Sequence, residues 1–164
     1  MGTGKTTIGR MVADELKFEF LDTDRLIESR TGKTISQIFA DNGEETFREL
    51  EREVVNELAA SENIVIAAGG GLAANQENLD SLKTHALVVC LWSSPEKIWE
   101  RVRHQTHRPL LQDKNPLEKI RALLAAREPF YKQADVLVNS DMRSTKEVAQ
   151  HVLHQFHLAR SAQK

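Results

Sequence analysis

The sequence of 164 residues has few of the features that mark secreted or membrane proteins. Its single cysteine, Cys90, leaves no internal disulfide to form, and within the apolar run 86–91 we expect a reduced thiol. No apolar run approaches the roughly 20 residues that cross a bilayer, and the first residues lack a basic-then-apolar secretion signal. We therefore expect a cytoplasmic protein with no membrane partner.

An excess of charge of one sign is also absent. The 22 basic and 24 acidic residues are mixed along the chain and give a formal net charge of -2. Without a broad cationic face, nucleic acid is excluded as the main partner. Hydrophobic residues make up 40% of the chain, and single cores are commonly built from roughly 100 to 150 residues. We expect one domain over residues 1–164, acting as a monomer.

Apolar runs that are too short for core helices alternate with segments of helical periodicity. We expect helices over 6–16, 34–40, 44–60 and 117–127, with further helices starting at Pro95 and Ser144, and strands over 18–22, 63–68, 86–91 and 136–139. Such alternation predicts βαβ units, and hence a three-layer α/β/α sandwich with a parallel sheet. Ligands of such folds bind at the carboxyl ends of the strands.

The chain opens on a candidate phosphate-binding loop, Gly2-Thr3-Gly4-Lys5-Thr6-Thr7. This run matches the second half of the Walker A pattern, in which backbone N–H groups surround a phosphate at a helix N-terminus. In this interpretation Lys5 reaches the β- and γ-phosphates of ATP, and the hydroxyl of Thr6 binds Mg²⁺. The alternative is an ordinary glycine-rich segment before a helix.

The first half of that pattern is missing from the sequence. A complete Walker A motif has another glycine five positions before Gly4 and a β-strand leading into the loop. That strand normally runs through the middle of its sheet, and without it the two flanking strands expose unpaired backbone groups. We therefore expect a P-loop NTPase fold without its central first strand, and a native polypeptide that starts roughly ten residues or more upstream.

Two carboxylates follow the first expected strand in Leu21-Asp22-Thr23-Asp24. Phosphoryl transfer needs a held Mg²⁺ and an oriented acceptor hydroxyl, and carboxylates suit both tasks. We assign Asp22 to water-mediated contact with Mg²⁺ and Asp24 to the acceptor hydroxyl. The alternative is that one of them only caps the next helix.

A glycine triplet, Gly69-Gly70-Gly71, ends the second expected strand. Three glycines allow a substrate to approach the backbone and offer N–H groups to an anion, although alone they also fit a simple turn.

These motifs occur with Phe47-Arg48, Arg108-Pro109-Leu110-Leu111 and Arg127-Glu128-Pro129-Phe130-Tyr131 in the order and spacing of shikimate kinases. The chain resembles that family over nearly its whole length. The resemblance implies a kinase that uses ATP and Mg²⁺ to phosphorylate the 3-hydroxyl of shikimate, in the biosynthesis of chorismate and the aromatic amino acids.

The resemblance also implies roles for four arginines. Arg48 and Arg127 clamp the substrate carboxylate in a pocket that the glycine triplet completes, under a helical flap over about residues 25–60. Arg108 belongs to a lid over about 104–116 that closes on ATP, and Arg101 packs on adenine. From the residues alone, each arginine is equally compatible with solvation or a surface ion pair. His104 and His107 in this lid fit solvated residues better than metal ligands.

Two alternatives remain at this level. Another small-metabolite kinase, such as gluconate kinase, would share the fold and the phosphate loop, although the paired arginines and the glycine triplet favour shikimate. A truncated relative that binds a ligand without turning it over is supported only by the missing strand.

Overall fold

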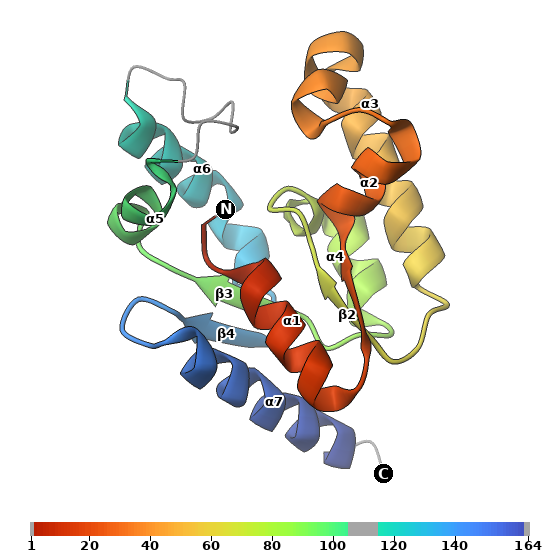
Figure 1. Ribbon diagram of the computed structural model, residues 1–164, viewed down its shortest axis with the longest axis vertical. Coiled ribbons are helices and arrows are strands. Elements are labelled where there is room, and N and C mark those ends of the chain that lie inside the picture. The colour runs from red at the N-terminus through yellow and green to blue at the C-terminus, as the bar shows by residue number, and fades with distance from the viewer. Residues whose placement is uncertain (1, 105–114, 163–164) are drawn as a thin grey trace.

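The structure is a computed structural model that describes residues 2–104 and 115–162 (Figure 1). Helices and short strands alternate along the chain: α1 (Lys5–Leu16), β1 (Glu19–Asp22), α2 (Thr23–Thr31), α3 (Ile35–Leu58), β2 (Ile64–Ala67), the 3₁₀ helix η1 (Leu72–Ala74), α4 (Gln76–Lys83), β3 (Val89–Trp92), α5 (Pro95–Val102), α6 (Pro116–Tyr131), β4 (Val136–Asn139) and α7 (Thr145–Ala162). Within the described ranges, no helix is both long enough and apolar enough to span a membrane.

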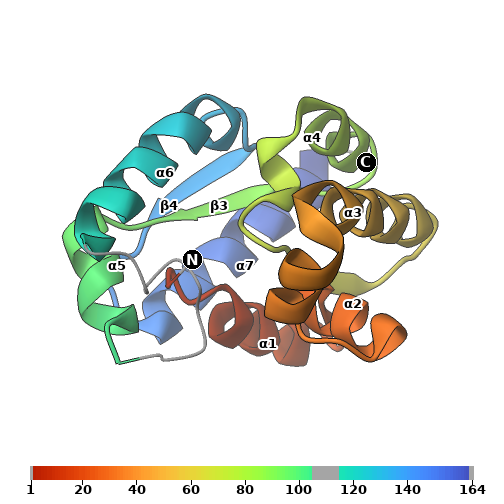
Figure 2. The ribbon, with the colours of Figure 1, turned by 90° about the horizontal axis from the view of Figure 1, so that it is seen from above.

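The strands form two parallel pairs. β1 pairs with β2, from Glu19 opposite Ile64 to Asp22 opposite Ala67, and β3 pairs with β4 from Val89 opposite Val136 onward. Figure 2 shows β3 and β4 between α6 on one side and α7 on the other, which gives three layers. The four predicted strands and the α/β class are confirmed, and the carboxyl ends of the paired strands lie at one edge.

The two strand pairs are separated by a cavity of about 1020 Å³. Its walls include β2 and β3, with α1 and α7 contributing from one helical layer and α4 and α6 from the other. The lining side chains are largely apolar, among them Ile8, Val65, Cys90, Leu91 and Phe156. This separation agrees with the expected lack of a central strand in this chain, because a strand between β2 and β3 would join the two pairs into one sheet.

Apolar side chains hold each strand pair against its helices. One buried cluster joins α1 and α7 to β4 through Ile8, Val12, Val138 and Val148. Another joins α2 to α3, and the partly buried β1 and β2 residues Leu21 and Ile66 pack against it. A third, smaller cluster holds α5 against α6. These contacts fix the strand ends from which the polar residues extend.

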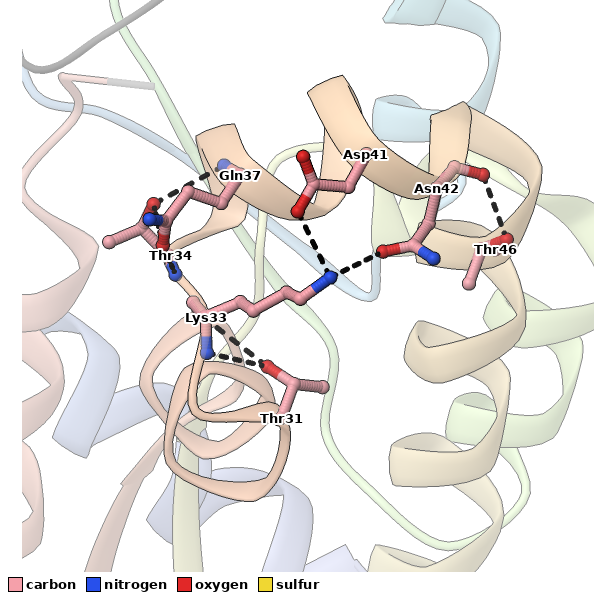
Figure 3. Close-up of polar contacts among 7 residues, drawn as sticks. All are labelled: Thr31, Lys33, Thr34, Gln37, Asp41, Asn42 and Thr46. Atoms are coloured by element: carbon pink, nitrogen blue, oxygen red, sulfur yellow. Dashed lines mark hydrogen bonds and ion pairs between the residues drawn. The ribbon is translucent and has the colours of Figure 1, made fainter.

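The α2–α3 connection is fastened by a polar cluster (Figure 3). Thr34 and Gln37 form a reciprocal capping box at the start of α3. The Lys33 ammonium donates to Asp41 Oδ2 at 3.0 Å and to Asn42 Oδ1 at 3.2 Å. At Gly43 the backbone leaves the helical region, with φ 84° and ψ 173°, and divides α3 into two segments. The predicted break between two helices is therefore confirmed.

Two helices and one helix end differ most from the sequence-based expectation. Helix α2 was foreseen only in the alternative that Asp22 or Asp24 caps a helix, and it starts directly at the strand end because Asp22 caps it. Helix α4 was also missed; Asn75 caps it by accepting from Asn78 N at 3.0 Å. Helix α6 continues past 127 to Tyr131 and contains Pro129, whose missing N–H costs the helix one i→i−4 hydrogen bond without ending it.

Candidate active site

The phosphate loop leads into α1 through two glycines in left-handed conformations. Gly2 has φ 67° and Gly4 has φ 90°. A Cβ on Gly2 would lie 2.7 Å from Val102 Cγ1, so a larger residue would push the loop away from α5. No side chain caps the start of α1. The start of a helix favours an anion, because its first N–H groups point outward and the positive end of the helix dipole lies there.

Thr6 and Asp22 join the loop to the carboxyl end of β1. Thr6 Oγ1 donates to Asp22 Oδ2 at 2.9 Å. The other oxygen, Oδ1, accepts from Arg25 N at 3.4 Å and caps α2. Asp22 therefore caps the next helix, which was the alternative to a metal role, and it also places a carboxylate beside Thr6. A hydroxyl and a carboxylate are hard oxygen donors of the kind that Mg²⁺ prefers.

Asp24 and Glu51 both approach the glycine triplet. Gly69 N donates to the buried Thr23 Oγ1 at 2.9 Å, which anchors the start of α2 to the triplet. A Cβ on Gly69 would lie 2.5 Å from Asp24 Oδ1 and 3.2 Å from Glu51 Oε1. Burial raises the pKa of Glu51, the bond to Arg48 opposes this shift, and the charge of Asp24 adds to it. Two carboxylates thus meet at the carboxyl end of β2.

Arg48 lies between two glutamates on α3. Its NH1 donates to Glu51 Oε2 at 2.5 Å, while Nε and NH2 donate to Glu44 Oε1 at 3.2 and 2.8 Å. Burial acts to lower the pKa of Arg48, but hydrogen bonds and charges from Glu51 and Glu44 outweigh it and raise the pKa above its ordinary value. A Cβ on Gly71 would collide with NH1, so the guanidinium lies against the triplet backbone.

Helix α6 reaches the same triplet from the opposite side. Arg127 NH1 and Tyr131 Oη each donate to Gly70 O at 2.9 Å. Burial raises the pKa of Tyr131, which remains a neutral donor around neutral pH. The charge of Arg127 also acts on Glu51. Arg48 and Arg127 therefore flank one short stretch of backbone.

Arg101 connects α5 to the phosphate loop and to the end of β4. Its guanidinium donates to Gly2 O at 3.4 Å, to Ser93 Oγ at 3.3 Å and to Ser140 O at 3.0 Å. Asp141 accepts from Ser93 Oγ and from Ser94 N. Burial acts to raise the pKa of Asp141, but these hydrogen bonds and the charge of Arg101 lower it below its ordinary value.

Comparison with known proteins identifies the family. The shikimate kinase family model matches residues 1–157. A shikimate kinase of Thermodesulfovibrio yellowstonii is 41% identical over 156 residues, which cover 95% of this chain and 90% of the relative. The chain belongs to the shikimate kinase family. A shikimate kinase of Thermus thermophilus is 46% identical over 154 residues, covering 93% of this chain and 84% of that relative.

Solved structures of the family have the same fold. A shikimate kinase from Acinetobacter baumannii, in complex with shikimate, superposes with a TM-score of 0.91 at 40% identity and covers 98% of this chain and 89% of that one. A shikimate kinase from Aquifex aeolicus gives a TM-score of 0.84 at 37% identity, covering 96% and 92%. Family membership makes this chain an ATP-dependent kinase with Mg²⁺ as its cofactor.

The residues around the phosphate loop of this chain suit the binding of ATP and Mg²⁺. The uncapped start of α1, the positive φ of Gly2 and Gly4, and the oxygen pair of Thr6 and Asp22 suit a phosphate with a hard cation beside it. Of the predicted substrate residues, the structure brings Asp24, Arg48, Arg127 and the triplet Gly69–Gly71 together. Arg108 and His107 lie outside the described residues.

Sequence reasoning missed the residues that hold this shikimate kinase site in place. Glu51 follows Arg48 by three positions and Tyr131 follows Arg127 by four, and both spacings place two side chains on one helical face. That regular spacing was the available signal. Thr23 and Asp141 carried no comparable signal, because their partners lie 46 and 48 residues away in the chain.

Proposed function

We propose that the chain transfers the γ-phosphoryl of ATP to the 3-hydroxyl of shikimate, with the candidate active site as its catalytic site. The observation that carries this proposal is that Asp24, Arg48 and Arg127 lie around the glycine triplet. The bonded pair of Thr6 and Asp22 links the phosphate loop to the end of β1. A carboxylate beside two guanidinium groups suits a substrate that carries both a hydroxyl and a carboxylate.

The nucleotide side of the site consists of residues 2–7 with Asp22. Gly2, Thr3, Gly4 and Thr7 line the loop, Lys5 places its ammonium at the β- and γ-phosphates, and Thr6 with Asp22 holds Mg²⁺, Asp22 through water. When bound, the cation neutralises charge on the phosphoryl oxygens. In the same proposal Arg101 packs on adenine, and Arg108 adds positive charge at the transferred group.

The acid side of the site orients the acceptor. Arg48 and Arg127 bind the shikimate carboxylate, and backbone N–H groups of the triplet complete the pocket. This leaves the 3-hydroxyl beside Asp24, which accepts a hydrogen bond from it. As the bond from the hydroxyl oxygen to γ-phosphorus forms, the bond between that phosphorus and the β–γ bridging oxygen breaks. Asp24 takes the hydroxyl proton, and ADP leaves.

The domain organisation, oligomeric state, location, partners and pathway belong to the same proposal. The chain is one domain, with a flap over about residues 25–60 and a lid over about 104–116. It acts as a monomer in the cytoplasm, a reducing compartment that suits its single free thiol, Cys90. It has neither a nucleic-acid nor a membrane partner, and its pathway is the biosynthesis of aromatic amino acids.

A coupled ADP-release assay with shikimate and gluconate as rival acceptors tests the proposal. We expect saturable turnover with shikimate and at most background release with gluconate, because the paired arginines and the glycine triplet are the features that favour shikimate. Equal turnover with both acceptors, or release with gluconate alone, would overturn the assignment. Shikimate binding without ADP release would support the alternative of a non-catalytic relative.

A further inference from the structure

Arg48 holds two carboxylates of very different accessibility. The Glu51 side chain is 1% exposed and donor and acceptor are 2.5 Å apart, whereas the Glu44 side chain is 66% exposed. Removing the buried partner would leave a charge without compensation inside the protein. The exposed partner can turn into water at little cost, because half-exposed ion pairs are worth little.

The Glu44 contact occupies an edge of the guanidinium that a substrate carboxylate needs. Glu44 Oε1 accepts from both Nε and NH2, at 3.2 and 2.8 Å, while NH1 donates to Glu51. Carboxylates bind arginine most strongly through two parallel N–H donors on one edge. An incoming acid therefore meets a guanidinium whose Nε–NH2 edge is already taken.

The charges around Arg48 also favour the withdrawal of one glutamate when an acid binds. The two guanidinium groups of Arg48 and Arg127 face the carboxylates of Glu44, Glu51 and Asp24, which gives a formal local charge of −1. A further carboxylate would be repelled less if one of the two glutamates withdrew. Glu51 is enclosed between α3 and the triplet, so Glu44 is the partner that can leave.

The position of Glu44 at a helix start favours its negative charge even when the side chain does not contact Arg48. It is the first residue after Gly43, where α3 breaks, and it therefore starts the second helical segment. Negative charge is favoured in the first turn of a helix whether or not it contacts Arg48. The bonds from Lys33 to Asp41 and Asn42, and from Thr46 Oγ1 to Asn42 O, fix the break itself (Figure 3). Only the side chain has to move.

We propose that Glu44 is a built-in competitor of the acid substrate: it occupies the Nε–NH2 edge of Arg48 in the empty site, and the substrate carboxylate displaces it on binding. The inference rests on the proposed function, since it takes shikimate as the acid. Glu44 thereby lowers the affinity for the substrate, because displacing it costs free energy. Glu51 has the opposite role and keeps Arg48 in position.

Calorimetric titration of shikimate into the wild type, Glu44→Gln and Glu45→Gln tests the proposal. Glu45 is the matched control, because it is the next residue, is exposed, and loses the same charge on substitution. We expect Glu44→Gln to bind shikimate about two- to fivefold more tightly, the range expected from a largely exposed charge pair. The Kd of Glu45→Gln should stay within about 1.5-fold of the wild type.

Steady-state kinetics give a second readout, because a merely structural role of Glu44 would not lower the KM for shikimate selectively. In Glu44→Gln the KM for shikimate should fall by the same factor, while the KM for ATP stays unchanged. Unchanged or weaker shikimate binding by Glu44→Gln would overturn the inference and leave the proposed function intact. An equal gain in Glu45→Gln would overturn it too, by pointing to general electrostatics. A wild type that binds no shikimate would overturn both.

Discussion

At the scale of single residues, the proposed chemistry depends on Asp24, whose Oδ1 would lie 2.5 Å from a Cβ added to Gly69. Asp24→Asn keeps the size of the side chain and removes its ability to take a proton. We expect kcat to fall by about two or more orders of magnitude, the usual cost of losing a positioned acid–base group. Near-normal turnover of the purified, folded variant would rule out this role. Asp80→Asn on α4 serves as a control and should retain wild-type turnover.

Arg127 should affect binding more than chemistry. In the proposed site its contact with the acid substrate lies away from the reacting phosphorus, so that ground state and transition state would share it. Arg127→Ala should raise the KM for shikimate by tenfold or more, with a smaller change in kcat. Initial-rate kinetics over a wide range of shikimate concentrations measure both constants. An unchanged KM would contradict the clamp.

Asp141 gives a prediction with a defined pH dependence. Its pKa is lowered in the folded protein, so its contribution to stability is present above the ordinary value of 3.8 and is lost as the pH falls through the lower folded-state pKa. Asp141→Asn should reduce the free energy of unfolding at pH 7 by about 1 kcal/mol, allowing for solvent screening. Urea unfolding between pH 3 and pH 7 should show this deficit shrinking below about pH 3.8. A deficit that does not vary with pH would indicate a purely steric effect.

At this scale the sequence predicted which residues gather in the candidate site better than it predicted the contacts that hold them there. Asp24, Arg48 and Arg127 were identifiable because motifs carry them, and the structure brings them together. Arg101 was expected near adenine, but its contacts with Gly2 and Ser140 depend on segments about 99 and 39 residues away, which no local pattern reveals.

At the scale of elements, the backbone conformations of Gly32, at the end of α2, and Gly43, within α3, can be compared directly. Gly32 has φ 66° and ψ 11°, a left-handed conformation that asparagine adopts readily. Gly43 has φ 84° and ψ 173°, a region open to almost no other residue. A Cβ at either position meets no atom within 4 Å, so the backbone conformation alone decides the outcome.

Gly43→Asn should therefore lower the free energy of unfolding by about 1–3 kcal/mol. Gly32→Asn should change it by at most about 0.5 kcal/mol. Urea denaturation of both variants measures the difference. Equal costs would show that the break in α3 does not depend on the conformation of Gly43.

Elements with strong local signals were predicted well. The break at Asn42-Gly43 and the Ser144–Glu147 capping box carried their own punctuation, and both are present. A helix starting at Asp22 was raised only as the alternative to a metal role, and the side chain does cap α2 while it also accepts a hydrogen bond from Thr6. The end of α6 was placed four residues too early, at 127 rather than at Tyr131.

At the scale of the whole molecule, a cavity of about 1020 Å³ lies between β2 and β3. Its walls are apolar side chains and strand edges that a bridging strand would cover. The sequence predicted this separation through its incomplete Walker motif, since the missing half of that motif includes a strand. How far the two pairs separate could not be predicted, because packing between distant helices sets that distance.

An engineered extension tests what the cavity can hold. Joining an apolar strand of about five to six residues and a complete phosphate loop to the amino end should raise Tm by several degrees, since about 1 kcal/mol shifts Tm by roughly 2–4 °C at this size. An extension of equal length built from lysine, glutamate and proline is the control. Thermal unfolding that is identical for the two extensions would show that neither enters the cavity.

The central claim is that one site passes phosphate from ATP to an organic acid. The most direct measurement follows radiolabel from the γ-position of ATP into shikimate, with Asp24→Asn as the matched variant. The account predicts labelled shikimate 3-phosphate from the wild type and at least a hundredfold less from the variant. Label that appears only in inorganic phosphate, or equal labelling by both proteins, would contradict it.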